Sequence, residues 1–217
     1  MQPLDGPRIE PKSVAASALV VLLHGYGANG DDLIALGEAW RSRLPDVAFA
    51  APNAPEPIPG MHGALQWFAL TMRDANETWR GVGAARPALD RFLDAELARY
   101  RLSADRLVLV GFSQGTMLAL HIGLRRFAAP AAIVGYSGLL AGAEHLGEIS
   151  ARPPVLLIHG EADDLIPADA LHVAREQLAH AGLRVEWHIR PGLGHGIDAG
   201  GEKMAAHFIA EALRTTS

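Results

Sequence analysis

A five-residue turn, Gly-Phe-Ser-Gln-Gly at positions 111–115, constrains this chain more than any other segment. It follows the apolar run 107–110 and leads into the apolar segment 116–120, which is the pattern of a strand, a tight turn and a helix. A serine at the centre of such a turn has a strained backbone, and its hydroxyl group projects from the end of the sheet. The flanking glycines are needed because a side chain at either position would collide with the neighbouring strand or helix. The turn therefore predicts a nucleophile at Ser113.

A serine nucleophile needs a base and an orienting acid, and candidates for both follow it in the order serine, acid, histidine. The acid is one of two adjacent aspartates, Asp163 and Asp164, which follow a short apolar run. The base is His195, in the glycine-rich segment 192–196, where a glycine on each side indicates a tight bend. These candidates lie just past predicted strands, and the carboxyl ends of parallel strands meet at one edge of a sheet, where active sites form. We therefore expect them to meet Ser113.

A third segment supplies candidate hydrogen-bond donors. The apolar run 19–23 leads directly into His-Gly-Tyr-Gly at 24–27. A developing oxyanion needs two backbone N–H groups directed at one point. We expect one from Gln114, at the positive end of the helix that follows the serine, and the other from Tyr26.

Predicted strands and helices alternate along the chain. The strands are short continuous apolar runs, as expected for strands buried on both faces, at 18–23, 47–51, 106–110, 131–136, 155–159 and 185–189. The helices are predicted at 31–43, 83–100, 114–126, 168–181 and 200–214, with Asp31 as the cap of the first. This alternation indicates an α/β architecture with a mostly parallel sheet and helices on both faces. A chain of 217 residues is expected to form one domain, residues 1–217.

Two connecting segments bear on access to the predicted site. The longest irregular stretch, 52–80, carries four prolines before Gly60. Because irregular stretches of that length in compact domains are usually functional, we place it over the active-site edge as a wall of the substrate site. The segment 137–154 is too short for a helical cap domain. We therefore predict an open site.

Composition excludes several classes of protein. The net charge is −5, so no basic field is available and we expect no nucleic-acid partner. The absence of cysteine excludes disulfides, thiolate metal sites and a cysteine nucleophile. No apolar run approaches transmembrane length, so we expect no stable membrane insertion. The apolar run 14–23 is interpreted as a buried strand rather than a signal segment because it ends in His-Gly. A cytoplasmic location is the default expectation.

Four segments resemble the small carboxylesterase, acyl-protein thioesterase and phospholipase family of α/β-hydrolases. They are Leu-His-Gly-Tyr-Gly at 23–27, Gly-Phe-Ser-Gln-Gly at 111–115, His-Gly-Glu-Ala-Asp at 159–163 and Gly-His at 194–195. The resemblance implies a single-domain α/β-hydrolase without a large cap domain. The family pattern His-Gly-x-x-Asp selects Asp163 as the acid. Tyr26 stands where the family usually has leucine, and Thr116 replaces a usual glycine and is expected to crowd the start of the helix.

The reaction expected on these grounds is a two-step acyl transfer from an ester to water. His195 takes the proton of Ser113 as its hydroxyl attacks the ester carbonyl, and Asp163 orients the imidazole. The backbone N–H groups of Tyr26 and Gln114 stabilise the oxyanion. No metal-ligand spacing such as His-Glu-x-x-His is present, and the reaction requires no cofactor.

The expected substrate is a small ester with a short to medium acyl chain. Apolar side chains on the predicted active-site loops suggest a short groove, which the bulk of Tyr26 would shorten further: Met61, Trp67, Phe68, Leu165, Ile166 and Leu193. The alternative is a lysophospholipase or acyl-protein thioesterase that acts on longer chains. The resemblance is also compatible with a homodimer.

A rival motif indicates a different class of protein. The glycines of 25–30 match G-x-G-x-x-G between a strand and a helix, the fingerprint of dinucleotide binding. Dinucleotide binding requires an acidic residue at the end of the next strand, where it binds the ribose. Residues 50–53 are Ala-Ala-Pro-Asn and include no carboxylate. This interpretation also leaves Ser113, Asp163 and His195 unexplained. A catalytically inactive hydrolase fold used as a binding module is a further alternative, which nothing in the sequence favours because every catalytic position is filled.

Overall fold

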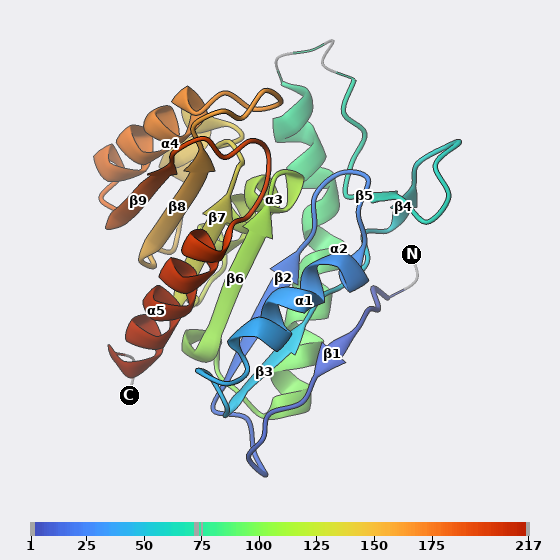
Figure 1. The fold of residues 1–217 in the computed structure, drawn as a ribbon, viewed down its shortest axis with the longest axis vertical. Coiled ribbons are helices and arrows are strands. Elements are labelled where there is room, and N and C mark those ends of the chain that lie inside the picture. The colour runs from blue at the N-terminus through green and yellow to red at the C-terminus, as the bar shows by residue number, and fades with distance from the viewer. Residues whose placement is uncertain (1–2, 72–73, 75, 216–217) are drawn as a thin grey trace.

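A seven-stranded sheet forms the centre of the molecule (Figure 1). The computed structural model describes residues 3–71, 74 and 76–215. In spatial order the strands are β1 (Arg8–Ile9), β3 (Val47–Ala50), β2 (Ala18–Leu23), β6 (Leu107–Phe112), β7 (Ala132–Tyr136), β8 (Val155–Gly160) and β9 (Val185–Arg190). Strand β1 is antiparallel to β3, and the remaining pairs are parallel. The expected mostly parallel α/β sheet is confirmed.

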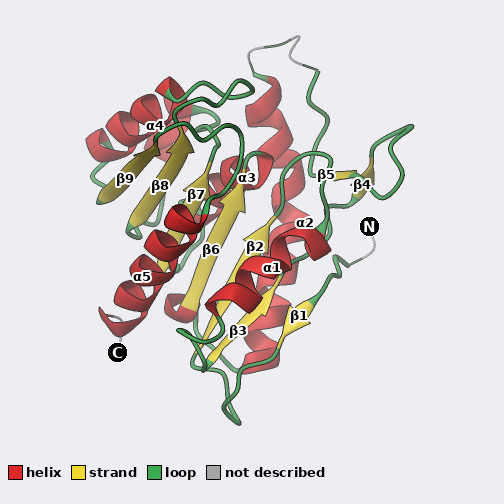
Figure 2. Ribbon diagram, in the orientation of Figure 1, coloured by secondary structure: helices red, strands yellow, loops and turns green. Residues whose placement is uncertain are grey.

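Helices cover both faces of this sheet (Figure 2). Helices α1 (Gly30–Trp40) and α5 (Ala199–Thr215) pack on one face, and α2 (Glu77–Tyr100), α3 (Gln114–Gly123) and α4 (Asp169–His180) pack on the other. Two short 3-10 helices, η1 (Ala104–Arg106) and η2 (Ala143–Glu148), lie in connecting segments. None of the helices in the described residues is long and apolar enough to cross a membrane.

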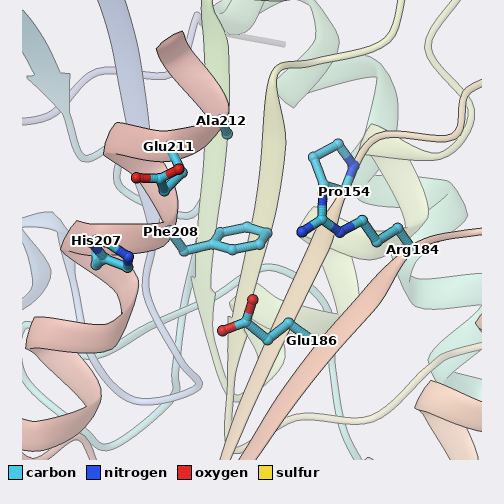
Figure 3. A pocket seen from close by; sticks show the side chains of 7 residues that line it. All are labelled: Pro154, Arg184, Glu186, His207, Phe208, Glu211 and Ala212. Atoms are coloured by element: carbon cyan, nitrogen blue, oxygen red, sulfur yellow. The ribbon is translucent and has the colours of Figure 1, made fainter. Parts of the chain in front are cut away.

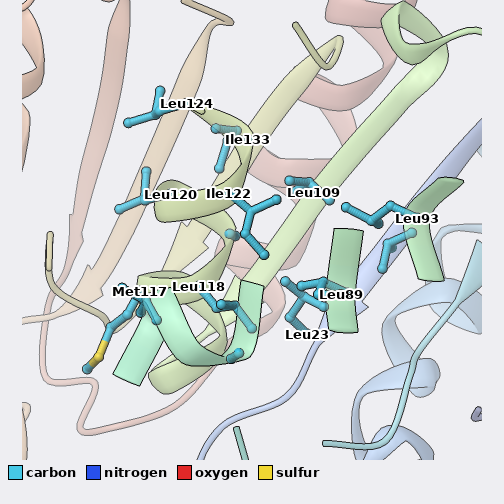
Figure 4. Packing of buried hydrophobic residues seen from close by; sticks show 14 of the residues in the cluster. Leu23, Leu89, Leu93, Leu109, Met117, Leu118, Leu120, Ile122, Leu124 and Ile133 are labelled. Atoms are coloured by element: carbon cyan, nitrogen blue, oxygen red, sulfur yellow. The ribbon is translucent and has the colours of Figure 1, made fainter. Parts of the chain in front are cut away.

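The central strands alternate their side chains between two apolar cores. All six residues of β2 are buried, with Leu19 and Leu23 in the core under α2 and α3, and Val20 on the opposite side under α1. Figure 4 shows the first core, where leucines of α2 and α3 pack against one face of the central strands. Burial of apolar surface contributes about 25 cal/mol per Å². The packing therefore holds the carboxyl ends of β2 and β6 side by side.

The strands expected from the sequence lie within two residues of their predicted ends, but other details differ. Helix α2 begins at Glu77 rather than at position 83. It continues without a break through Gly81 and Gly83. The first helix is capped by Asn29 and not by Asp31. The Asn29 side chain accepts from the first-turn backbone, and Asp32 accepts from the Asn29 N–H, so the two satisfy orphan donors reciprocally.

The long segment 52–80 is more regular than its sequence indicates. It contains the hairpin strands β4 (Glu56–Pro57) and β5 (Leu65–Gln66) and the first turn of α2, and its positions 72, 73 and 75 lie outside the described residues. The connection between β7 and β8 contains only η2. The expectation that no large cap forms there is confirmed.

Candidate active site

Ser113 occupies a strained turn between β6 and α3. Its backbone has φ 54° and ψ −115°, a conformation that costs a non-glycine residue on the order of 1–3 kcal/mol. Its N–H donates to the carbonyl of Tyr136 at 2.9 Å, which attaches the turn to the neighbouring strand β7. The predicted strained bend is confirmed, and the surrounding strands hold it.

Close packing explains the glycines on either side of Ser113. A Cβ atom on Gly115 would overlap the carbonyl oxygen of Leu23, and one on Gly111 would overlap the backbone of Gly115. The predicted collisions are therefore confirmed. A Cβ on Gly25 would lie 3.3 Å from Cβ of Ser113, so the loop after β2 lies directly against the serine.

Thr116 fits the start of α3 without crowding it, contrary to the expectation. Its methyl group occupies space that Gly135 and Gly138 leave open, since a Cβ on either glycine would overlap it. Its hydroxyl lies 2.8 Å from the carbonyl oxygens of both Gly111 and Tyr136. Thr116 thus links the turn to β7.

Asp163 and His195 meet at the same edge of the sheet. The distance between His195 Nδ1 and Asp163 Oδ2 is 2.8 Å. The ring of His195 lies 5.0 Å from that of Phe112, the residue before the serine. Within the described residues no hydrogen bond joins Ser113 Oγ to His195; in ligand-free sites such bonds often form only when substrate binds. The adjacent Asp164 is exposed.

The surroundings of Asp163 favour its ionised form. Its Oδ1 accepts from the backbone N–H groups of Leu165 and Ile166 at 3.0 and 2.9 Å. Nε2 of His159 lies 3.1 Å from Oδ2 and 2.8 Å from the Ile166 carbonyl oxygen. Burial acts to raise the pKa of Asp163, but the N–H of Ile166, His195 and the N–H of Leu165 together hold this pKa below its ordinary value. A buried anion is therefore available to orient His195.

Polar contacts that the sequence did not reveal hold the loop of His195. Arg190, at the end of β9, contacts Asp198 through Nε and Nη2 at 3.0 and 2.9 Å, closing the loop between them. The Gly192 N–H donates to Glu161 Oε2 at 3.0 Å. The loops of the aspartate and the histidine are thus joined to each other. No local sequence pattern signals these pairs.

The glycines beside His195 are not required by its backbone. A Cβ on Gly196 would meet nothing within 4 Å, and one on Gly194 only an oxygen at 3.8 Å. The positive φ in this loop belongs to Gly192, at 67°. The chain does bend at His195 and Gly196, as expected, but neither flanking glycine has a positive φ and the bend does not depend on them.

The two expected oxyanion donors have no acceptor among the residues that the structure describes. The N–H of Gly27 donates to Leu65 at 2.9 Å, and Leu65 donates to Ala28 at 3.1 Å, so the loop is paired on one side. Neither Tyr26 nor Gln114 donates its backbone N–H to another group in the part of the chain that the structure describes. Both donors can therefore serve a bound ligand.

The six apolar residues expected in the substrate groove divide into two groups. Met61 and Leu165 are 51% and 69% exposed, and Ile166 and Leu193 are partly buried. Trp67 and Phe68, in contrast, are 2% and 4% exposed and belong to the main core. Their prediction as groove surface is wrong, because long-range packing buries them.

A surface pocket of about 300 Å³ is lined by none of the proposed catalytic residues (Figure 3). It is lined by Pro154, Arg184, Glu186, His207, Phe208, Glu211 and Ala212. Pro154 and Arg184 precede β8 and β9, so the pocket is at the amino ends of these strands. The aspartate–histidine pair is at the carboxyl ends, where sheets of this kind bind ligands.

A serine on a strand–turn–helix bend, with an aspartate and a histidine on later loops of the same sheet edge, is the arrangement that defines the α/β-hydrolases. Sequence comparison narrows this class. The chain matches the Phospholipase/Carboxylesterase family over residues 4–213 and belongs to it. It is therefore a serine hydrolase acting on ester bonds, and the dinucleotide-binding and inactive-module interpretations are wrong.

Relatives of known structure or activity agree with this assignment. Acyl-protein thioesterase 1 of Gibberella zeae is 28% identical over 207 residues, which is 87% of this chain and 88% of that protein. Esterase YpfH of Escherichia coli is 26% identical over 201 residues, 93% and 84% of the two chains. The crystal structure of esterase PE8 superposes with a TM-score of 0.93 at 42% identity, covering 97% of this chain and 100% of that one.

Proposed function

We propose that this protein is a carboxylesterase for short- to medium-chain esters, with Ser113 as nucleophile, His195 as base and Asp163 as orienting acid. The observation that carries the proposal is the 2.8 Å contact between His195 Nδ1 and Asp163 Oδ2, on loops adjoining the strained serine turn. Because Asp163 occupies Nδ1, the other ring nitrogen of His195 is the one available to accept a proton.

The proposed reaction has two acyl-transfer steps. Oγ of Ser113 attacks the ester carbonyl carbon while its proton passes to Nε2 of His195. The tetrahedral oxyanion accepts from the N–H groups of Tyr26 and Gln114, each contributing about 3 kcal/mol. The carbon–oxygen bond to the alcohol then breaks, and His195 returns the proton to the departing alcohol. Water, activated by His195, releases the acyl group and restores Ser113.

The preference for shorter chains follows from the limited apolar surface around the site. Met61, Leu165, Ile166 and Leu193 remain as groove candidates, whereas the aromatic pair at 67–68 belongs to the core. Each buried methylene contributes about 0.8 kcal/mol, so kcat/KM should rise with acyl length only while the groove continues. Longer chains would extend into water.

The second candidate, hydrolysis of acyl-protein thioesters, is favoured by the thioesterase relatives at 28% identity. A series of p-nitrophenyl esters below their micelle concentrations, with thioesters of matched acyl groups, separates the two. An optimum among short to medium chains and a preference for oxygen esters would support the carboxylesterase. A continued rise to palmitoyl substrates would indicate the thioesterase or a lysophospholipase instead.

Covalent labelling tests the proposed nucleophile. A fluorophosphonate should add at Ser113, located by intact-mass and peptide mass spectrometry, and Ser113→Ala should abolish labelling and turnover. Label on another serine, or an active alanine variant, would overturn the assignment.

The two neighbouring aspartates provide a matched test of the acid. Asp163→Asn should fold but lower kcat on the order of 10⁴-fold, through loss of the imidazole tautomer. Asp164→Asn should have little effect because Asp164 is exposed. The reverse result would show that the orienting acid is Asp164 and not Asp163.

A further inference from the structure

The side chain of Gln114 is a buried amide with a partner at each end. Its Oε1 accepts from the backbone N–H of Trp67 at 2.8 Å, and its Nε2 donates to the backbone carbonyl of Phe68 at 2.8 Å. The residue is fully buried. Because an unpaired amide is costly in such a place, both bonds are needed there. Gln114 therefore links the serine turn firmly to the segment 65–68.

The segment held by Gln114 also holds the loop that carries Tyr26. Leu65 accepts from the N–H of Gly27 at 2.9 Å and donates to the carbonyl of Ala28 at 3.1 Å. These two bonds pair the residues immediately after Tyr26 with the segment 65–68. A displacement of this segment would consequently move the Tyr26 N–H.

A third bond fixes the same loop before Tyr26. Nε1 of Trp67 donates to the carbonyl of His24 at 2.9 Å, and the two rings lie 5.3 Å apart. Tyr26 is thus anchored on both sides by the segment 65–68. This segment is in turn anchored by Gln114.

We propose that the side chain of Gln114 is a positioning residue that sets the relative placement of the two oxyanion donors. One donor is its own backbone N–H, and the other is the N–H of Tyr26, reached through the segment 65–68. Donors act only within about 2.7–3.1 Å of the oxyanion, so a small shift of either reduces its effect. The inference rests on the proposed function, which assigns the oxyanion to these two groups.

The variant Gln114→Met isolates the side chain. Methionine has similar length and no amide, and the backbone N–H at 114 is retained. We expect kcat to fall about 10- to 100-fold, less than the roughly 10²- to 10³-fold typical of a deleted donor, because both donors remain but are misplaced. KM should change less than about threefold, since the interaction is made in the transition state.

A tetrahedral inhibitor distinguishes positioning from a purely structural role. Butylboronic acid forms a tetrahedral anion on a catalytic serine, so its affinity reports on the oxyanion donors. Its affinity should fall by the same factor as kcat/KM in Gln114→Met. A purely structural role would lower the melting temperature and leave the boronate affinity unchanged in the folded fraction.

Two tryptophan variants provide a second and milder test with a matched control. Trp67→Phe removes the donor to His24 and should weaken boronate binding and kcat together, about three- to tenfold for one lost hydrogen bond. Trp40→Phe removes the same atoms from another buried tryptophan, whose Nε1 has no partner among the described residues, and should change neither. If Gln114→Met does not fold, this pair decides the question.

Unchanged boronate affinity in folded Gln114→Met, or equal effects of Trp67→Phe and Trp40→Phe, would overturn the inference. So would a loss confined to KM. These results are separable from failure of the proposed function: in that case Ser113→Ala would keep its activity and bind the boronate. Parallel losses in Gln114→Met and Trp67→Phe, with Ser113 essential, would support the inference.

Discussion

The two halves of the proposed active site are held in place by different forces. The serine turn, residues 111–115, is fixed by backbone atoms in direct contact, with Gly115 against the carbonyl of Leu23. The acid–base loops, residues 161–167 and 191–198, are joined by backbone hydrogen bonds such as that from the Ala162 N–H to the Leu193 carbonyl, and they are held further by polar side chains such as Arg190 with Asp198. The glycines of the first half should therefore tolerate no added volume, while Gly194 and Gly196 of the second should tolerate a methyl group and the polar contacts there should not be lost without effect.

The position of each half in the sheet explains this difference. The serine turn follows β6, a central strand buried along almost its whole length. The histidine loop follows β9, an edge strand in which no residue is fully buried. Apolar packing is sparse at that edge, so hydrogen bonds and an ion pair supply the constraint.

The largest effect on stability is expected from adding a methyl group to the serine turn. Gly115→Ala should lower the free energy of unfolding by about 3 kcal/mol or more, because overpacking at a backbone contact cannot be relieved by a side-chain rotation. Gly196→Ala, in the histidine loop, should change this free energy by less than about 0.5 kcal/mol. Urea unfolding of both variants measures the contrast; equal losses would remove the distinction between the halves.

The same difference explains what the sequence could predict. The serine turn is predictable because its glycines, strand and helix are neighbours along the chain. A family pattern is needed to select Asp163 over Asp164. The contact of Arg190 with Asp198 is not predictable from the sequence, since only the folded loop brings the two together. The sequence also cannot show that Trp67 belongs to the core, because an apolar residue on a loop can face either substrate or core and only tertiary packing decides.

A smaller loss is expected from the hydroxyl that ties the serine turn to β7. Thr116→Val keeps the volume but removes the hydroxyl shared by the carbonyls of Gly111 and Tyr136. The free energy of unfolding should fall by about 1 kcal/mol, the net contribution of one hydrogen bond, because the Tyr136 carbonyl keeps its bond from the Ser113 N–H. Thr116→Ser keeps this hydroxyl and should lose less. If serine proves worse than valine in thermal unfolding, the methyl contact is the more important one.

The ion pair of the histidine loop should have a weaker and pH-dependent effect. Arg190→Gln should lower the free energy of unfolding only slightly, as for a partly exposed pair, and it should lower kcat because the loop of His195 is held less firmly. The hydrogen bond from Arg190 lowers the pKa of Asp198 from its ordinary value of 3.8. The deficit should thus be complete at neutral pH and shrink as the pH falls below that value. Arg184→Gln, at the exposed start of β9, is the control; a deficit independent of pH would contradict the ion-pair explanation.

The smallest single effect is expected at Glu161, and it shows whether the acid–base loops act as one unit. Glu161→Ala removes the acceptor of the Gly192 N–H at an exposed site and should cost about 0.5 kcal/mol. The backbone N–H of Glu161 also donates to the Arg190 carbonyl at 3.0 Å, so the two side chains brace the same stretch of chain. In a double-mutant cycle with Arg190→Gln, we expect the losses in kcat to be coupled by about 0.5 kcal/mol or more. If the losses in kcat are strictly additive, each contact holds its own part of the loop. The contacts of the acid–base loops would then be independent restraints rather than a network.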